Sequence, residues 1–225
     1  MILSKSDYRY YILADRIAKG MPAKYSPKDF LRSILYPNHI WLFQKQLRKL
    51  EYYINCKKGL YYAFRRIQIQ RKFNKLSLKL GFSIPPNVFG PGLSIAHYGT
   101  IIVNSGAKVG ENCRLHACVN IGTEAGYSDK APQIGDNCYI GPGVKMFGNI
   151  QIASGTAIGA NAVVTKSSFE DNIVLAGVPA KKIAETNTRK MLIPATILIK
   201  SVNNIENLSV REIKAIIKEL RNSES

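Results

Sequence analysis

"IGDNCYIGPGVKMFGNIQIASGTAIGANAVV", residues 134–164, carries a branched aliphatic residue or methionine at every sixth position. This period does not match an α-helix, which has 3.6 residues per turn, or a long strand of alternating polarity. It matches a chain that turns a corner every six residues, so we predict triangular coils that stack through parallel strands. The inward residues are Val103, Val109, Leu115, Ile121, Ile134, Ile140, Met146, Ile152, Ile158 and Val164.

The corners of these coils have a composition of their own. Four places after most inward residues stands a small or branched residue, as at Ala107, Cys113 and Ala162, which relieves crowding at the bend. One segment, "TEAGYSDKAPQ" at residues 123–133, interrupts the repeat. With three six-residue units per coil, we expect roughly four to five coils across residues 84–180.

The repeat and the stretch "AGVPAKK" at residues 176–182 resemble the hexapeptide acyltransferases, and among them serine acetyltransferases and capsule or sugar O-acetyltransferases. The resemblance covers about residues 80–185. It implies a mainly β fold, a left-handed parallel β-helix, with an N-terminal α-helical domain and a C-terminal helix, assembled as a homotrimer. We therefore expect a basic helical domain at 1–80, the acyltransferase domain at 81–185 and a C-terminal extension at 186–225.

Helical periodicity marks both ends of the chain. Residues 4–80 read as three or four helices separated near Pro22, Pro27 and Pro37. The segment "SVREIKAIIKELRN", residues 209–222, predicts a terminal amphipathic helix of about 12 residues that must dock on the rest of the protein, because short helices alone are marginal in water. Ser209 and Glu212 have capping-box spacing, and its apolar stripe consists of Ile213, Ile216, Ile217 and Leu220.

The charge is concentrated near the N-terminus. The chain carries a formal net charge of +17, and residues 1–80 hold 18 Lys and Arg against 4 Asp and Glu, whereas residues 81–185 are balanced. The segment 57–75 interleaves aromatic and basic residues, but a solvated basic helix face explains this pattern without RNA. We expect no nucleic-acid partner, and a peripheral contact with an anionic membrane or polymer is one interpretation of the charge. No apolar run is long enough to span a bilayer and no signal peptide is recognisable, so we expect a cytoplasmic protein.

Transfer of an acyl group from a thioester to a hydroxyl needs a base, an oxyanion site and a proton for the leaving thiolate, and no metal. His97, in "IAHYGTIIV", matches the catalytic histidine of the resemblance, although its place six residues before Val103 would also suit a hydrogen-bonded core histidine. His116 follows inward Leu115 at a corner and is a candidate second catalytic group facing a neighbouring subunit. His39 reads as a turn or cap residue.

The resemblance also assigns positions for the acyl donor, and the departures from it indicate candidates for the acceptor. For acetyl-CoA as acyl donor, the matching residues are Pro142, Ala160, Thr165, Lys166 and Lys181. For the acceptor, the candidates are Ser83, Tyr98, Glu124, Asp129 and Lys130. Four positions depart from the serine enzymes: Ser83 and Ala96 replace carboxylates, and Lys130 with Ala131 replaces an Arg-His pair.

These departures weaken the grip on an amino-acid carboxylate, because Lys does not reproduce the bidentate fork of Arg. Glu124 or Asp129 is a candidate replacement for the carboxylate, unless the loop is a plain surface loop. Our main interpretation is therefore an acetyl-CoA-dependent O-acetyltransferase that acts on a sugar hydroxyl in surface polysaccharide synthesis, free or carrier-linked. The alternatives are an L-serine O-acetyltransferase of cysteine biosynthesis and a non-enzymatic β-helix scaffold with basic binding helices.

Overall fold

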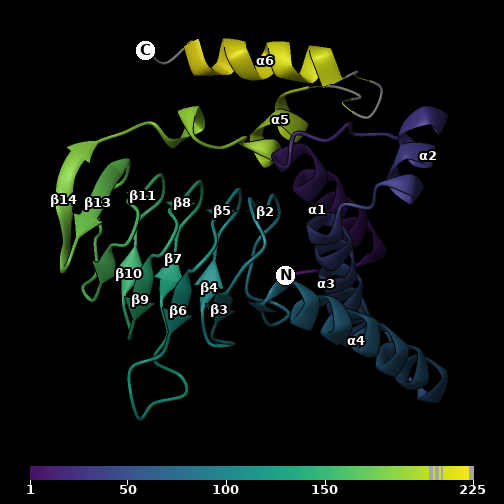
Figure 1. The fold of residues 1–225 in the computed structure, drawn as a ribbon, viewed down its shortest axis with the longest axis horizontal. Helices are drawn as coiled ribbons and strands as arrows, with labels where there is room; N and C mark the ends of the chain where they lie inside the picture. Colours follow the sequence, from purple (N-terminus) through teal and green to yellow (C-terminus); the bar gives the residue numbers. More distant parts are fainter. Residues whose placement is uncertain (203–204, 206–207, 209, 223–225) are drawn as a thin grey trace.

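The computed structural model describes residues 1–202, 205, 208 and 210–222. Four helices come first, in agreement with the predicted three or four: α1 (Lys5–Ala18), α2 (Pro27–Leu35), α3 (His39–Cys56) and α4 (Leu60–Leu80). They stand together at one end of a stack of coils (Figure 1). Within the described residues, no helix is long and apolar enough to cross a bilayer.

The stack is a parallel β-helix with three faces. Each parallel strand is two to five residues long, because it spans one flat side of a coil before the chain turns. Face 1 contains β1 (Phe82–Ser83), β3 (Ile101–Val103), β6 (Asn120–Gly122), β9 (Lys145–Phe147) and β12 (Val163–Val164). Face 2 contains β4 (Lys108–Val109), β7 (Gln133–Ile134) and β10 (Gln151–Ile152). Face 3 contains β2 (Ser94–Ile95), β5 (Arg114–Leu115), β8 (Tyr139–Ile140), β11 (Ala157–Ile158) and β13 (Ile173–Gly177), and β14 (Ala180–Glu185) closes it as an antiparallel strand.

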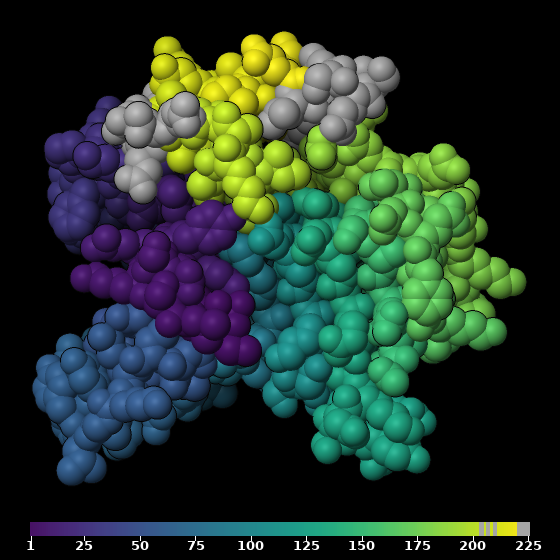
Figure 2. Space-filling model, turned by 180° about the vertical axis from the view of Figure 1, so that it is seen from behind, coloured from purple at the N-terminus to yellow at the C-terminus, as the bar shows by residue number. Residues whose placement is uncertain are grey.

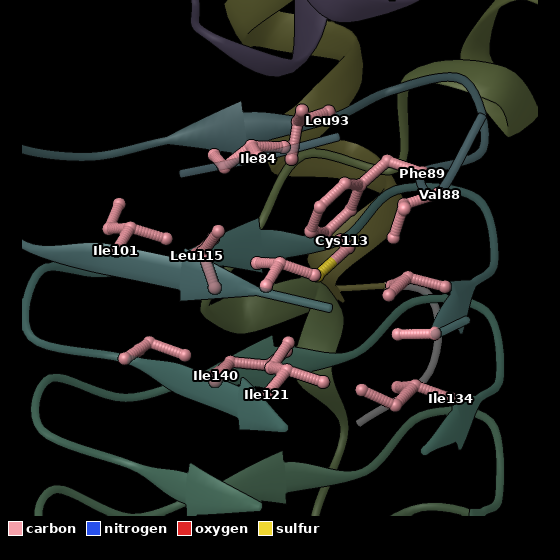
Figure 3. Packing of buried hydrophobic residues seen from close by; sticks show 14 of the residues in the cluster. Ile84, Val88, Phe89, Leu93, Ile101, Cys113, Leu115, Ile121, Ile134 and Ile140 are labelled. Carbon is pink, nitrogen blue, oxygen red and sulfur yellow. The ribbon is translucent and has the colours of Figure 1, made fainter. Parts of the chain in front are cut away.

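The interior of the coils is filled by the residues that the six-residue period selects. All of the predicted inward residues, from Val103 to Val164, are at most 4% exposed. Figure 3 shows Leu115, Ile121, Ile134 and Ile140 pointing into the interior from successive faces. Burial of these side chains is the main stabilising contribution, at roughly 1.5–3 kcal/mol for each large aliphatic residue.

The corners depend on left-handed backbone conformations. Asn112, Asn137, Asn161 and Asn172 have φ between 54° and 58°, and each directly precedes a buried residue at a bend. Asparagine tolerates this region better than other residues with a side chain. The small residues that follow, such as Cys113 and Ala162, then face the core.

The C-terminal segment returns to the N-terminal helices. It contains a 3₁₀ turn (Thr188–Lys190), α5 (Ala195–Ser201) and α6 (Val210–Asn222). Ile213 and Ile217 of α6 are buried in a second core with residues of α1 and α5, which confirms that the terminal helix docks (Figure 1). The predicted capping residue Ser209 and the side chain of Leu220 lie outside the described residues.

Candidate active site

His97 and His116 lie together at the corner between faces 3 and 1. His97 belongs to the turn that follows β2, and His116 directly follows β5, which pairs with β2. Their ring centroids are 6.0 Å apart, with the ring planes at 52°. The structure therefore brings the two predicted catalytic histidines into one site.

The inward register predicted for His97 is wrong. Ile95 pairs with Leu115, and Val103 pairs with Ile121. Seven residues therefore lie between Ile95 and Val103, whereas five lie between Leu115 and Ile121 on the next coil. The connection from β2 to β3 is therefore two residues longer, Ile95 takes the inward position and the His97 side chain is exposed. His97 is consequently not a core histidine, and its imidazole is open to a substrate.

His116 has a more enclosed environment. Its ring lies 5.0 Å from the ring of Tyr139, and Arg114 Nε donates to His116 Nε2 over 3.4 Å. Burial lowers the pKa of His116, and the charges of Arg114 and His97 lower it further. His116 is therefore neutral near pH 7, and because its Nε2 accepts from Arg114, it is less suited than His97 to act as a base.

Sequence reasoning missed three residues around this pair: Arg114, Tyr139 and Lys19. A signal existed for two of them, because Arg114 and Tyr139 each precede an inward residue by one place and the strands pair them in register. Lys19, just after α1, donates from Nζ to the carbonyl oxygen of Ile95 over 2.9 Å, and burial lowers its pKa to about 8. No local pattern links that lysine to a turn more than 70 positions downstream.

The predicted acceptor residues near this corner make few contacts. Tyr98 follows His97 and is 75% exposed. Ser83 lies exposed on face 1, where it pairs with Ile102. Among the residues that the structure describes, neither Ser83 nor a carboxylate hydrogen-bonds to His97, so these residues give its imidazole no orienting anion.

Glu124, Asp129 and Lys130 occupy a different corner, between faces 1 and 2, in the loop that interrupts the repeat. This loop projects from the body in Figures 1 and 2. Lys130 Nζ lies 3.3 Å from Glu124 Oε2 and 3.3 Å from the centre of the Tyr127 ring. Lys130 therefore has partners within the loop, and within one chain it lies at a different corner from the two histidines.

The predicted coenzyme A positions divide between three places. Pro142 and Ala160 share the histidine corner on successive coils, where Asn161 N donates to the Pro142 carbonyl oxygen over 2.9 Å. Thr165 and Lys166 lie at the corner between faces 1 and 2, and Lys181 lies on β14 opposite Ala176. All five are exposed. Within one chain, only Pro142 and Ala160 lie at the same corner as the histidines.

The described residues contain no group of three or more His, Cys, Asp or Glu side chains arranged to hold a metal ion. The histidine corner contains two imidazoles, a guanidinium and a row of small residues.

Comparison with known proteins finds similarity to hexapeptide-repeat transferases and to serine acetyltransferases. Residues 131–166 match the family model "Bacterial transferase hexapeptide (six repeats)". A serine acetyltransferase of Staphylococcus aureus is 33% identical over 131 residues, which are 57% of this chain and 59% of the relative. The crystal structure of a serine acetyltransferase from Brucella abortus has a TM-score of 0.62 at 27% identity, covering 82% of this chain and 72% of that one.

The resemblance to hexapeptide-repeat acyltransferases is confirmed. A second Brucella abortus structure of serine acetyltransferase, in complex with coenzyme A, has a TM-score of 0.58 at 29% identity and covers 80% of this chain and 68% of that one. The chain spans about half the length of the curated relatives that it matches, from 43% to 59%.

Proposed function

We propose that this protein is an acetyl-CoA-dependent O-acetyltransferase with His97 as its general base. The observation that carries the proposal is the exposed His97 imidazole, 6.0 Å from His116, at a corner continued by small residues on the next coils. An exposed imidazole is accessible to a bound substrate and has a nitrogen that accepts a proton.

The reaction needs both substrates at this corner. His97 takes the proton of the acceptor hydroxyl as its oxygen attacks the thioester carbonyl, and the carbon–sulfur bond then breaks. The proton on His97 passes to the leaving thiolate. Arg114 and neutral His116 lie beside this position and supply donors and positive charge for the oxyanion of the tetrahedral intermediate.

Coenzyme A fits the row of small residues that leads away from the histidines. Ala117, Pro142 and Ala160 follow one another at this corner, and Gly143 N donates to the Ala117 carbonyl oxygen over 3.0 Å. Small side chains leave backbone groups accessible to the pantetheine arm. Lys181, on β14 after the last coil, is the cation that we propose for the phosphate groups.

A homotrimer of left-handed β-helices completes the site. In one chain the loop with Glu124 and Lys130, and the turn with Thr165 and Lys166, lie at a different corner from His97. Rotation about a threefold axis would place this second corner of one copy against the histidine corner of the next. The separation of these two corners within one chain is the observation that supports the predicted trimer.

L-serine is the acceptor that the comparisons support best. The similar proteins named above are serine acetyltransferases, with identities of 27–33%. This favours the serine alternative over the sugar hydroxyl that the sequence departures favoured.

A sugar hydroxyl is the second candidate, and a specific observation favours it. Ser83, Ala96 and Ala131 provide no charge for a small zwitterion, and Lys130 is already paired with Glu124. A sugar presents a broader surface that neutral groups and exposed aromatic rings such as Tyr98 recognise without a carboxylate clamp.

Steady-state thiol release from acetyl-CoA, measured with L-serine and with a panel of hexoses and hexose-containing carriers, tests the proposal. Saturation by L-serine with kcat/KM about tenfold or more above every sugar supports the first acceptor, and the reverse order supports the second. Release of thiol that no acceptor accelerates, together with no binding of coenzyme A, would remove the enzyme proposal and leave the scaffold hypothesis.

A further inference from the structure

Helix α2 turns its apolar side chains to the solvent. Phe30, Leu31, Ile34 and Leu35, here called the α2 apolar face, are 58–64% exposed, and no residue of the helix is buried. A surface helix of a globular protein ordinarily buries its apolar stripe. Four large aliphatic or aromatic side chains together on one exposed helix face therefore indicate a contact surface.

The polar side of α2 faces the body of the protein instead. Asp29, Arg32, Ser33 and Tyr36 line a pocket of about 320 Å³ between α2, the end of α1 and the start of α3. Trp41 and Lys45 of α3 line the opposite wall. The apolar side of α2 therefore faces solvent and its polar side faces the protein, which is the opposite of what burial of apolar side chains favours.

Local interactions at its N-terminus stabilise α2, although the helix buries none of its side chains. Pro27 occupies its first turn, Ser26 Oγ accepts from Asp29 N over 3.1 Å, and Asp29 Oδ2 accepts from Ser26 N over 3.1 Å. This capping box satisfies the first free backbone N–H groups of the helix. The apolar face is therefore presented on a preformed element, which stands out from the body at the upper right of Figure 1 and the upper left of Figure 2.

The charges around this face select its partner. Lys24, Lys28 and Arg32 are exposed on and beside α2, and the one acidic residue of the helix, Asp29, is held in the capping box. Helix geometry places Lys28 and Arg32 along one edge of the apolar face. Apolar side chains bordered by basic ones are the pattern of a helix that lies in the interface of an anionic membrane.

We propose that the α2 apolar face docks this protein on an anionic lipid bilayer. A second copy of the chain is a poorer occupant, because pairing α2 with α2 would bring Lys28 and Arg32 of both copies together without an opposing carboxylate. Anionic headgroups instead neutralise these cations while the four apolar side chains enter the acyl boundary. This inference is independent of the acetyl transfer proposed above.

Vesicle co-sedimentation of the full chain tests the proposal. The protein should bind vesicles that contain about one-quarter phosphatidylglycerol at least about tenfold more strongly than vesicles of phosphatidylcholine alone. Raising the salt from about 0.1 M to about 1 M should weaken this binding, because it screens the headgroup charge. Equal binding to both vesicles, or none to either, would overturn the proposal.

The double variant Leu31→Glu/Ile34→Glu should lower binding to the anionic vesicles by about tenfold or more, with unchanged circular dichroism, since neither side chain supports the core. Phe169→Glu is the matched control, because Phe169 is 76% exposed on a turn near the last coil and should not matter. Undiminished binding of the double variant would refute the role of α2.

Insertion has a separate readout. A tryptophan at position 30, from Phe30→Trp, should be quenched by brominated lipid, whereas the single native tryptophan, Trp41, is 3% exposed and supplies a constant background. Light scattering distinguishes the other occupant. An assembly in solution that the double variant dissociates, without any change in vesicle binding, would assign the α2 apolar face to a second copy and overturn the membrane proposal.

Discussion

Arg48 of α3 grips the carboxylate of Asp15 of α1 through two hydrogen bonds, Nε to Oδ2 at 2.8 Å and Nη2 to Oδ1 at 3.2 Å, and both side chains are fully buried. The same guanidinium donates to the carbonyl oxygens of Phe89 and Gly90 in the first coil. Asp15 in turn accepts from Leu93 N over 2.9 Å. This network ties the N-terminal helices to the start of the β-helix.

Arg48→Leu should lower the free energy of unfolding by about 3–5 kcal/mol, because it leaves the Asp15 and Glu51 carboxylates buried without a cation. Urea unfolding followed by circular dichroism measures the change. Arg71→Leu, at an exposed position of α4, is the matched control and should cost no more than about 0.5 kcal/mol. A comparable loss in both variants would show that the network adds no specific stability.

Gly141→Ala should destabilise the coils by about 1–3 kcal/mol. A methyl group at Gly141 would lie 2.6 Å from the carbonyl oxygen of Ile158 on the next coil, and that backbone is held in a strand. Gly106→Ala is the milder comparison, since its methyl group would meet no atom closer than 3.3 Å. Thermal unfolding of the two variants should rank them in this order, and equal melting temperatures would contradict the close-approach argument.

The sequence predicts the coils well because the residues that fill their core repeat at a short, fixed spacing along the chain. An inward side chain at every sixth residue is enough to define faces and corners, and Val103 through Val164 are buried as expected. The same period misplaced His97, because the longer turn before Val103 is visible only once Ile95 is paired with Leu115.

Contacts between distant segments left no such pattern. Lys19 meets Ile95, and Arg48 meets Asp15 and Phe89, through packing of helices on the first coil. Neither a period nor a motif in the sequence specifies which face of each helix packs against that coil. The outward orientation of the apolar side of α2 could not be predicted for the same reason, since its amphipathic sequence alone would place Leu31 and Ile34 inward.

His116 should titrate below the ordinary histidine value of 6.5, because burial and the nearby Arg114 and His97 oppose its protonation. Between its lowered folded pKa and 6.5, the unfolded chain binds more protons at this position than the folded chain. The contribution of His116 to the free energy of unfolding therefore falls as the pH falls through that window.

Nuclear magnetic resonance titration of the three histidines, with His116→Asn for assignment, measures this pKa directly. Arg114→Gln should raise it part of the way toward 6.5, since burial, the largest cause, remains. A His116 pKa at or above 6.5 in the unmodified protein would contradict the lowering expected from burial and from the neighbouring Arg114 and His97.

His97→Ala should lower acetyl transfer by about a hundredfold or more while the chain stays folded and still binds coenzyme A. The exposed side chain supports no core contact, so its loss removes the base without a structural cost. His39→Ala is the control, because His39 begins α3, where its Nε2 lies 3.2 Å from Lys79 Nζ, and should leave the rate within about twofold. Thiol release measures the rate, and added imidazole should partly restore His97→Ala. If His97→Ala instead keeps the full rate, the base lies elsewhere, and His116, the other imidazole of this corner, becomes the first candidate.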